Sequence, residues 1–428
     1  MHSESAMSSP LELPTAPARM PWHDRRLRQA VFARLGKLQH GCVTVLDAEG
    51  AHPFGQTGPE CPLCATVVIH DPNAYRRLAL RGSIGVGEGY MAGEWSCADL
   101  PGLVRIFVLN QDALQGLEHG LTRLMMPLFR WLYACRDNSE RGSRLNIAAH
   151  YDLGNEFYRL FLDDTLMYSS AIFPTPDAGL REASIAKLER ICRKLELQPD
   201  DHLLEIGSGW GGFALYAAQH YGCRVTTTTI SREQYELTVE RVRAAGLADR
   251  VTVLCRDYRD LRGRFDKLVS IEMIEAVGER HLPTYFRACA DLLKPHGMML
   301  LQAITVADQK YEQYRNEVDF IRHYIFPGGF LPSLTAMADT LGRVTDLRIF
   351  HLEDIGAHYA TTLRHWRERF LGNLERVRAL GFPDPFIRMW EYYLCYCEGG
   401  FRERAIGTVQ LLLTKPHCRR EPLTPTLV

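Results

Sequence analysis

The sequence predicts an α/β protein in which a large C-terminal domain, built on a parallel β-sheet, follows a smaller α/β domain. From residue 184 onward, strand-like segments alternate with helical segments of about 10–15 residues, which is the pattern of βαβ units on one sheet. A glycine-rich turn follows the first of these strands and opens a helix, as in Rossmann-like folds. The length of 428 residues also suits more than one domain.

In the C-terminal domain the segments follow one another in a regular order. The expected strands cover residues 201–206, 223–230, 250–254, 265–271, 297–304, 344–352 and 406–414. The expected helices cover residues 184–196, 212–221, 232–245, 280–294, 308–322, 334–341, 358–380 and 384–401. This order predicts one sheet with helices inserted between its strands.

The N-terminal region divides into a tail, a small domain and a linker. Residues 1–22 are rich in Ser and Pro and are expected to be disordered. Residues 23–118 should form the small domain. It is expected to begin with a basic helix between Pro21 and His40, followed by strands at 41–48 and 65–70 with turns between them. Helices are expected at 73–82 and 98–116, separated by a glycine-rich stretch. Residues 119–145 form the linker. Its apolar, arginine-bearing part at 120–136 is either a helix packed between domains or a helix facing lipid.

Composition and charge limit the function classes. The 46% hydrophobic and 24% charged residues are ordinary for a globular protein, and the net charge of −1 does not favour a nucleic acid partner. No apolar run is long enough to span a bilayer, and the N-terminus lacks the apolar core of a secretory signal. The 12 cysteines show no regular spacing, so we expect buried thiols in a reducing cytosol. Cys61 and Cys64 form a lone CxxC pair without further ligands, so no metal site is expected.

The glycine loop at 205–212, E-I-G-S-G-W-G-G, predicts a cofactor site. Glycines allow a tight turn and a close approach of the backbone to a ligand. A dinucleotide-binding site requires an acidic residue about 20 residues further on, which binds the ribose hydroxyl. Here the next strand ends in T-T-T-T-I-S at 226–231, without an acid. Instead, Glu205 stands two residues before the first glycine, where its carboxylate suits the ammonium of S-adenosylmethionine. Asp257 and Tyr258 come just after the next strand, where the protein would contact the adenine of the cofactor. Alternatively, Asp257 is a turn residue and Tyr258 is a core residue.

Several spaced motifs resemble the cyclopropane fatty acid synthase and mycolic acid cyclopropane synthase family. They are HYDLGN at 150–155, LMYSSA at 166–171, the loop at 205–212, TISREQ at 229–234, DYRD at 257–260, YIFPGG at 324–329 and GAHY at 356–359. The stretch GEGYMAGEW at 87–95 is similar to the substrate-engaging N-terminal domain of the phospholipid enzymes. The resemblance implies a class I (Rossmann-like) methyltransferase sheet in residues 146–428, and it covers the chain from about residue 28.

The resemblance also implies a reaction and a set of site residues. The family transfers the methyl group of S-adenosylmethionine to a cis double bond of an acyl chain, and a bound bicarbonate then removes a proton from the carbocation so that a cyclopropane closes. The residues implied to bind the cofactor are Tyr168, Ser169, Glu205, Gly207, Gly209, Thr229, Ile230, Gln234, Asp257 and Tyr258. Glu275 is implied to hold the bicarbonate, with Ile304 and Tyr359 completing its shell. Cys397 matches a cysteine once considered catalytic, but no step requires a thiolate, so we interpret it as a small residue facing the acyl chain.

Three positions depart from the family pattern. Ser170 replaces the usual Cys, Gln302 replaces the usual His, and the usual Glu-His pair is Glu275-Ala276 here. Ser and Gln can still bind an anion, but a titratable imidazole is gone. If the carbocation loses a different proton, the product is a methyl-branched unsaturated chain instead of a ring.

The leading hypothesis is therefore an acyl-lipid methyltransferase acting on unsaturated membrane phospholipids. The basic helix at 25–37 and the segment at 120–136 would touch an anionic bilayer, which places the protein in the cytoplasm, peripheral to the inner face of the membrane. The resemblance also allows a homodimer. The alternatives are a methyltransferase for a soluble small molecule and a catalytically silent lipid-binding protein.

Overall fold

The computed structural model describes residues 21–113 and 153–423, and these fall into two compact units, Met1–Arg123 and Leu124–Val428. The segment at 120–136 and the residues His150–Asp152 lie outside the described residues, as does the tail up to residue 20. Trp22, the last residue of the expected tail, already belongs to the first helix.

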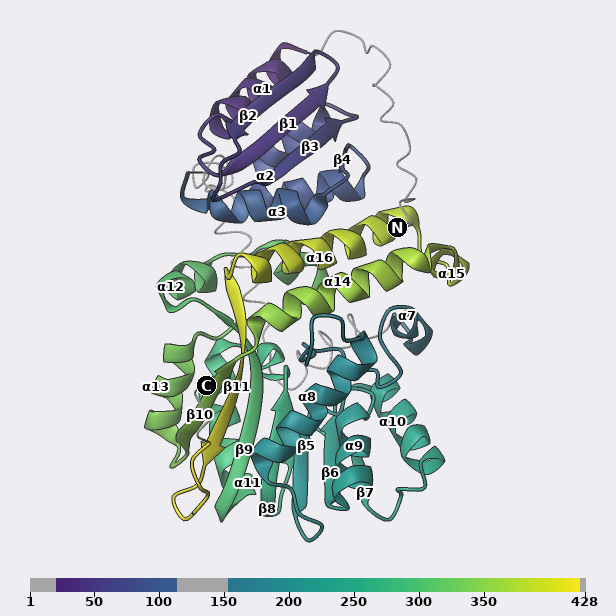
Figure 1. The fold of residues 1–428 in the computed structure, drawn as a ribbon, viewed down its shortest axis with the longest axis vertical. Coiled ribbons are helices and arrows are strands. Elements are labelled where there is room, and N and C mark those ends of the chain that lie inside the picture. Colours follow the sequence, from purple (N-terminus) through teal and green to yellow (C-terminus); the bar gives the residue numbers. More distant parts are fainter. Residues whose placement is uncertain (1–20, 114–152, 424–428) are drawn as a thin grey trace. The chain divides into compact units, whose positions relative to one another are not determined.

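Within residues 21–113, the N-terminal unit contains a four-stranded sheet together with α-helices (Figure 1). Its elements are α1 (Trp22–Leu35), β1 (Gly41–Asp47), β2 (Gly50–Gln56), β3 (Cys64–Ile69), α2 (Asn73–Met91), β4 (Trp95–Cys97) and α3 (Leu100–Leu109). The strand order is β2-β1-β3-β4; β1 and β3 run parallel and the two outer pairs antiparallel. Helix α1 and strands β1 and β3 confirm the predicted elements.

Two predictions for this unit were wrong. Residues 50–56, expected as turns, form β2, because Gly50 with a φ of 125° closes a tight hairpin onto Asp47. The glycine-rich stretch after residue 82 continues α2 to Met91, with a kink at Gly82. A Cβ on Gly85 would lie 2.1 Å from the carbonyl oxygen of Arg77. These glycines therefore allow close backbone packing and do not end the helix.

The structure joins Cys42 and Cys64 in a disulfide. The two residues are direct partners in the parallel pairing of β1 and β3, with their Cα atoms 4.6 Å apart, so the sheet itself brings the sulfur atoms together. The expectation of thiols was wrong for this pair. Cys61, the other half of the CxxC pair, stays a buried thiol.

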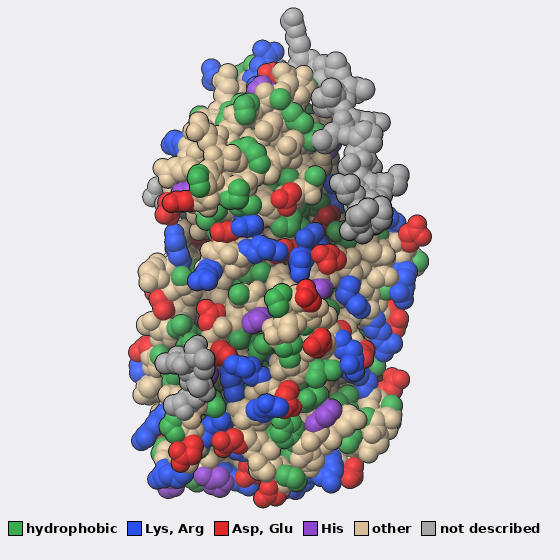
Figure 2. Space-filling view, in the orientation of Figure 1, with side chains coloured by type: hydrophobic (Ala, Val, Ile, Leu, Met, Phe, Trp, Pro, Cys, Tyr) green, Lys and Arg blue, Asp and Glu red, His purple; other side chains and the backbone are tan. Residues whose placement is uncertain are grey.

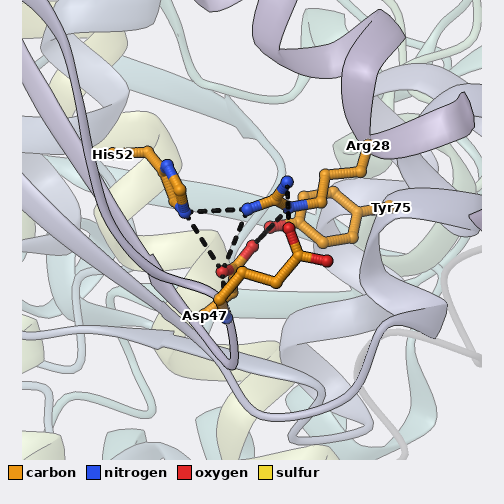
Figure 3. A network of polar contacts seen from close by, with 5 residues as sticks. Arg28, Asp47, His52 and Tyr75 are labelled. Carbon is orange, nitrogen blue, oxygen red and sulfur yellow. Dashed lines mark hydrogen bonds and ion pairs between the residues drawn. The ribbon is translucent and has the colours of Figure 1, made fainter. Parts of the chain in front are cut away.

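A polar network joins α1 to the sheet of the N-terminal unit (Figure 3). The Arg28 guanidinium donates to Asp47 Oδ2 at 2.6 Å, and the Tyr75 hydroxyl donates to the same oxygen at 2.6 Å. His52 Nε2 lies 3.3 Å from Asp47 Oδ1. Burial alone would raise the pKa of Asp47, but the bonds from Arg28 and Tyr75 lower it below its ordinary value. Arg28, a basic residue of the helix that was expected to touch the membrane surface, therefore holds α1 against the sheet.

The C-terminal unit contains a seven-stranded sheet in the order β10-β11-β9-β8-β5-β6-β7. Its strands are β5 (His202–Ile206), β6 (Arg224–Thr229), β7 (Val251–Cys255), β8 (Phe265–Ile271), β9 (Leu293–Val306), β10 (Arg348–Asp354) and β11 (Ile406–Thr414). Its α-helices are α7 (Asn155–Arg159), α8 (Leu180–Leu195), α9 (Gly212–Tyr221), α10 (Arg232–Ala244), α11 (Leu282–Leu292), α12 (Asp308–Asn316), α13 (Leu334–Val344), α14 (Gly356–Gly372), α15 (Leu374–Ala379) and α16 (Asp384–Arg402). The predicted α/β architecture, with helices inserted between the strands of one sheet, is confirmed.

Three details differ from the predicted elements. The predicted helix at 358–380 is divided at Asn373 into α14 and α15. Strand β11 is antiparallel to both of its neighbours, so the sheet is mixed and not wholly parallel. The predicted helix at 308–322 ends at Asn316, and a short π-helix follows at Ile321–Ile325. π-Helical turns are rare and often mark functional segments.

Successive strand residues supply two separate hydrophobic cores, one on each face of the sheet. Side chains alternate between faces along a strand, so both faces are apolar when both are covered. One core packs against α11 and α13 and includes Leu204, Leu268, Leu301 and Leu411. The other packs against α8 and α9 and includes Leu203, Val269, Leu300 and Leu412.

The direction of chain travel reverses between β5 and β8. The chain runs outward from β5 through β6 to β7, then returns to β8 on the other side of β5. In open α/β sheets, ligands bind at the carboxyl ends of the strands beside such a switch point. Helices α14 and α16 pack against each other and lie across one end of this sheet (Figure 1). Within the described residues, no helix combines the length and apolar character needed to cross a membrane.

Candidate active site

The glycine loop follows β5 at the switch point and has an unusual backbone. Gly207, Gly209 and Gly211 have φ values of 96°, 49° and 83°, which favour glycine. The Gly207 and Ser208 amides bond to the Thr228 carbonyl, which holds the loop against β6. A Cβ on Gly209 would meet no atom within 4 Å. The backbone at Gly209 is therefore open to a ligand, as the cofactor loop requires.

Glu205 is a buried carboxyl group at the end of β5, directly before this loop. The Thr227 hydroxyl donates to its Oε2 atom at 2.5 Å. Burial raises the pKa of Glu205 to about 8, against the opposing effects of Thr227 and the nearby Lys187 ammonium. Such a group can ionise when a cationic ligand arrives, which fits the ammonium of S-adenosylmethionine.

Lys187 is a site residue that the sequence reasoning missed. It lies on α8, is fully buried, and donates from Nζ to the Ser169 hydroxyl at 2.7 Å. Burial lowers its pKa to about 8, while Glu272, Asp163 and Glu205 act in the opposite direction. A lysine among the buried positions of α8, at helical spacing between Ser184 and Ile191, was the available signal.

The other expected cofactor residues lie on the loops after β6 and β7. The Thr229 hydroxyl donates to Gln234 Oε1 at 2.8 Å, with Ile230 between the strand and α10. Asp257 is buried and forms an ion pair with Arg259 of its own turn at 2.8 Å. Tyr258 packs edge-on against Tyr285 of α11, with ring centroids 5.5 Å apart. Because β5, β6 and β7 are parallel neighbours in this order, these loops leave the same edge of the sheet as the glycine loop. Asp257 is also part of a local ion pair.

A second carboxyl group, Glu272, gathers the residues expected around the bicarbonate. It follows β8 and has a φ of 49°, a strained value for a residue other than glycine. Its Oε1 atom accepts from the Ser170 amide at 2.9 Å and from Gln302 Nε2 at 2.7 Å. Its Oε2 atom accepts from the Tyr359 hydroxyl at 2.7 Å. Three segments distant in sequence therefore converge on this carboxyl group.

Glu275 lies one short turn further along the chain. The Ile304 amide donates to its Oε1 atom at 2.6 Å, as expected, whereas Tyr359 bonds to Glu272 instead. The Oε2 atom of Glu275 is inaccessible to solvent and has no hydrogen-bond partner in the structure. Burial and the charge of Glu272 raise the pKa of Glu275 to about 8. The protonated form of Glu275 is therefore favoured at neutral pH.

The structure shows the hydrogen-bond partners of Ser170 and Gln302, two residues that differ from the family pattern. The Ser170 hydroxyl donates to the carbonyl oxygen of Ala171 at 3.0 Å, so only its backbone amide serves Glu272. Gln302 uses its amide nitrogen for Glu272 and its amide oxygen to accept from Gln410 at 3.0 Å. Glu272 was missed because its position, just past a strand, reads as an ordinary loop acid.

Aromatic side chains cluster around Tyr359, whose hydroxyl donates to Glu272. The rings of Tyr359 and Phe401 are stacked with centroids 4.4 Å apart, and Tyr168 lies 5.2 Å from Trp366. The Tyr168 and Tyr393 hydroxyls are 2.8 Å apart. Aromatic faces can stabilise a nearby cation, and close aromatic packing can exclude water from it.

Cys397 lies on α16 and is partly buried. Burial, and then the charge of Asp319, raises the pKa of its thiol well above the ordinary value. A thiolate nucleophile needs the opposite environment. Among the described residues, no group of three or more His, Cys, Asp or Glu side chains could hold a metal ion.

Residues 138–411 match the family model described as mycolic acid cyclopropane synthetase. The chain belongs to this cyclopropane synthase family. It is 41% identical over 367 residues to a tuberculostearic acid methyltransferase of Mycobacterium tuberculosis, covering 84% of this chain and 85% of the relative. It is 37% identical over 353 residues to the cyclopropane-fatty-acyl-phospholipid synthase of Escherichia coli K12, covering 82% of this chain and 88% of the relative.

Solved structures of the family agree with this membership. The cyclopropane synthase MmaA2 from Mycobacterium tuberculosis superposes with a TM-score of 0.60 at 30% identity, over 64% of this chain and 98% of the other. The mycolic acid cyclopropane synthase CmaA1, complexed with SAH and CTAB, gives the same values. The protein is thus an S-adenosylmethionine-dependent C-methyltransferase of the cyclopropane synthase family.

Proposed function

We propose that the protein methylates the cis double bond of an unsaturated acyl chain in a membrane phospholipid, and that the resulting carbocation closes to a cyclopropane. The observation that carries this proposal is the pairing of two carboxyl groups, Glu272 and Glu275, with an aromatic wall that includes Tyr359. A double bond that accepts a methyl group becomes a carbocation, which needs aromatic shielding and a base but no nucleophile.

Each part of the site has a role in this reaction. S-adenosylmethionine supplies an electrophilic methyl group when it is bound. Glu205 would hold its ammonium group, and the open backbone at Gly209 would let it approach. The rings of Tyr168 and Trp366 would face the cation and exclude water. The donors expected to hold a bicarbonate ion are already engaged by Glu272 and Glu275, so no step of the proposed reaction passes through that ion.

A methyl-branched product is the second candidate. A tuberculostearic acid methyltransferase is among the relatives, at 41% identity, and Gln302 stands where the family usually has an imidazole. Both products require the same methyl transfer and differ only in the proton that the carbocation then loses.

The lipid substrate is supported by the phospholipid synthase among the relatives and by α1. Trp22 is 69% exposed, and the guanidinium of Arg26 lies 5.3 Å from the centroid of its ring. An exposed tryptophan beside arginines suits the interface of an anionic bilayer. Basic and acidic side chains are mixed over the face of the C-terminal unit in Figure 2, so attraction to the membrane would be local. A soluble small-molecule substrate would not need these features.

The test is a reaction of the purified protein with dioleoylphosphatidylglycerol vesicles and S-adenosylmethionine carrying a labelled methyl group. We expect the acyl chains to gain the mass of one CH₂ group. Loss of olefinic protons in the NMR spectrum would identify the ring, and their retention would identify the methyl-branched chain. If no unsaturated acyl chain gains mass, the proposed function is wrong.

A further inference from the structure

We propose that the Glu272 carboxylate is itself the base of the reaction and occupies the place that a bound anion would take. This inference rests on the proposed function and names the group that removes the proton. The reason is positional, because Ser170, Gln302 and Tyr359, which are expected around a bicarbonate ion, converge on Glu272. The remaining expected donor, the Ile304 amide, serves Glu275.

The geometry around Glu272 is that of an anion site. The Ser170 amide, Gln302 Nε2 and the Tyr359 hydroxyl donate to it at 2.9, 2.7 and 2.7 Å. A carboxylate has about four lone-pair positions, so these three donors leave one position for a substrate proton. Bicarbonate would present oxygen atoms of the same kind to the same donors.

The strained backbone supports the same conclusion. Glu272 keeps a φ of 49°, and its amide donates to the Gln302 carbonyl oxygen at 2.8 Å, which fixes that turn. A residue other than glycine in this conformation costs about 1–3 kcal/mol. Strain of this kind persists where the side chain is needed at that point.

The surroundings of the two carboxyl groups favour different protonation states. Burial raises the pKa of Glu272 above its ordinary value, whereas its three donors and the buried Lys187 ammonium act in the opposite direction and favour the ionised form. Glu275 has one donor and an unpartnered, inaccessible oxygen, which favours its protonated form. Neighbouring carboxyl groups in unlike environments often divide base and acid roles in this way. Glu272 is thus the base and Glu275 the neutral neighbour.

The reaction balances with these groups alone. The C–S bond of the cofactor breaks as a bond forms between the methyl carbon and one alkene carbon, and the other alkene carbon becomes the cation. Glu272 then takes a proton from the new methyl group, and the electrons of that C–H bond close the ring. The products are S-adenosylhomocysteine, the cyclopropane and one proton, which Glu272 afterwards releases to solvent.

The first experiment measures S-adenosylhomocysteine release with dioleoylphosphatidylglycerol vesicles, in buffer stripped of carbon dioxide and in buffer with added bicarbonate. We expect equal rates for the unaltered protein. Glu272→Gln should lose about 100-fold or more of the rate, because an amide cannot accept the proton. Glu182→Gln on the exposed surface of α8 is the control and should keep the full rate. A rate of the unaltered protein that depends on bicarbonate, or an active Glu272→Gln variant, would overturn the proposal.

The second experiment is chemical rescue of Glu272→Gly. Glycine accepts the backbone conformation at this position, so the variant should fold and bind S-adenosylmethionine in calorimetry. Its three donors would then face a vacated site, and added bicarbonate should restore turnover, whereas Glu272→Gln should not respond. If bicarbonate does not restore turnover although the variant still binds S-adenosylmethionine, the proposal that Glu272 takes the place of a bound anion is contradicted. Failure of the proposed function looks different, because the unaltered protein would then methylate no acyl chain in either buffer.

Discussion

Gln410 lies directly opposite Gln302 on the neighbouring strand, and its amide nitrogen donates to the Gln302 oxygen at 3.0 Å. Gln410 Oε1 in turn accepts from Lys194 Nζ of α8 at 2.8 Å. Because Gln302 also donates to Glu272, a line of hydrogen bonds runs from α8 through two strands to the site. Helix α8 therefore supports the carboxyl cluster twice, through Lys187 and through Lys194.

Replacing Gln410 with Leu should weaken this line. The oxygen of Gln302 would stay buried without its donor, at a cost of about 1–3 kcal/mol in the free energy of unfolding. Gln302 would also be freer to turn away from Glu272, so kcat should fall while the Kd for S-adenosylmethionine stays unchanged. Chemical denaturation and steady-state kinetics test this. Gln313→Leu on exposed α12 is the control, and equal effects of the two variants would contradict the supporting role.

Replacing Tyr359 with Phe should slow turnover without unfolding the site. The variant loses the 2.7 Å bond to Glu272 but keeps the stacking on Phe401. A hydrogen bond to a charged group is worth about 1.5–3 kcal/mol, which corresponds to a decrease in kcat of about 10- to 100-fold. Single-turnover kinetics with saturating cofactor measures the effect. A fully active variant would show that the hydroxyl is dispensable.

Cofactor affinity should depend on pH through Glu205. Its pKa is about 8 in the structure, so below that pH the group is protonated and must lose its proton to bind an ammonium ion. Affinity for S-adenosylmethionine should therefore rise as pH rises toward about 8, with proton release on binding. Calorimetry in buffers of different ionisation enthalpy measures that release. Glu205→Gln should bind more weakly, and a pH dependence unchanged in that variant would place the titrating group elsewhere.

Replacing Cys397 with Ser should leave turnover nearly intact. The thiol pKa is raised by burial and by Asp319, so little thiolate exists at neutral pH. Iodoacetamide should also modify Cys397 slowly in the folded protein, as mass spectrometry of its peptide would show. Complete loss of activity in a folded Cys397→Ser variant would revive a role for the sulfur in catalysis.

Local patterns gave the elements of the sheet with close boundaries. Helix α9 covers Gly212–Tyr221, as predicted, because the glycine loop before it and the apolar residues within it are both visible in the sequence. The glycines of α2 misled the prediction, because their role is close packing against Arg77 and not a break. The disulfide was missed because only the pairing of β1 with β3 brings Cys42 to Cys64.

The sequence by itself determined the fold class, the position of the glycine loop and the family, because these depend on short motifs and on the spacing of apolar residues. Only the tertiary structure decided which carboxyl group the donors serve. Ser170, Gln302 and Tyr359 are far apart along the chain. They meet at Glu272 because Gln302 of β9 pairs beside the end of β8, where the start of α14 and the loop before α8 also lie. Hydrogen bonds act only over contact distances, so which partners they join follows from packing and not from the order of residues.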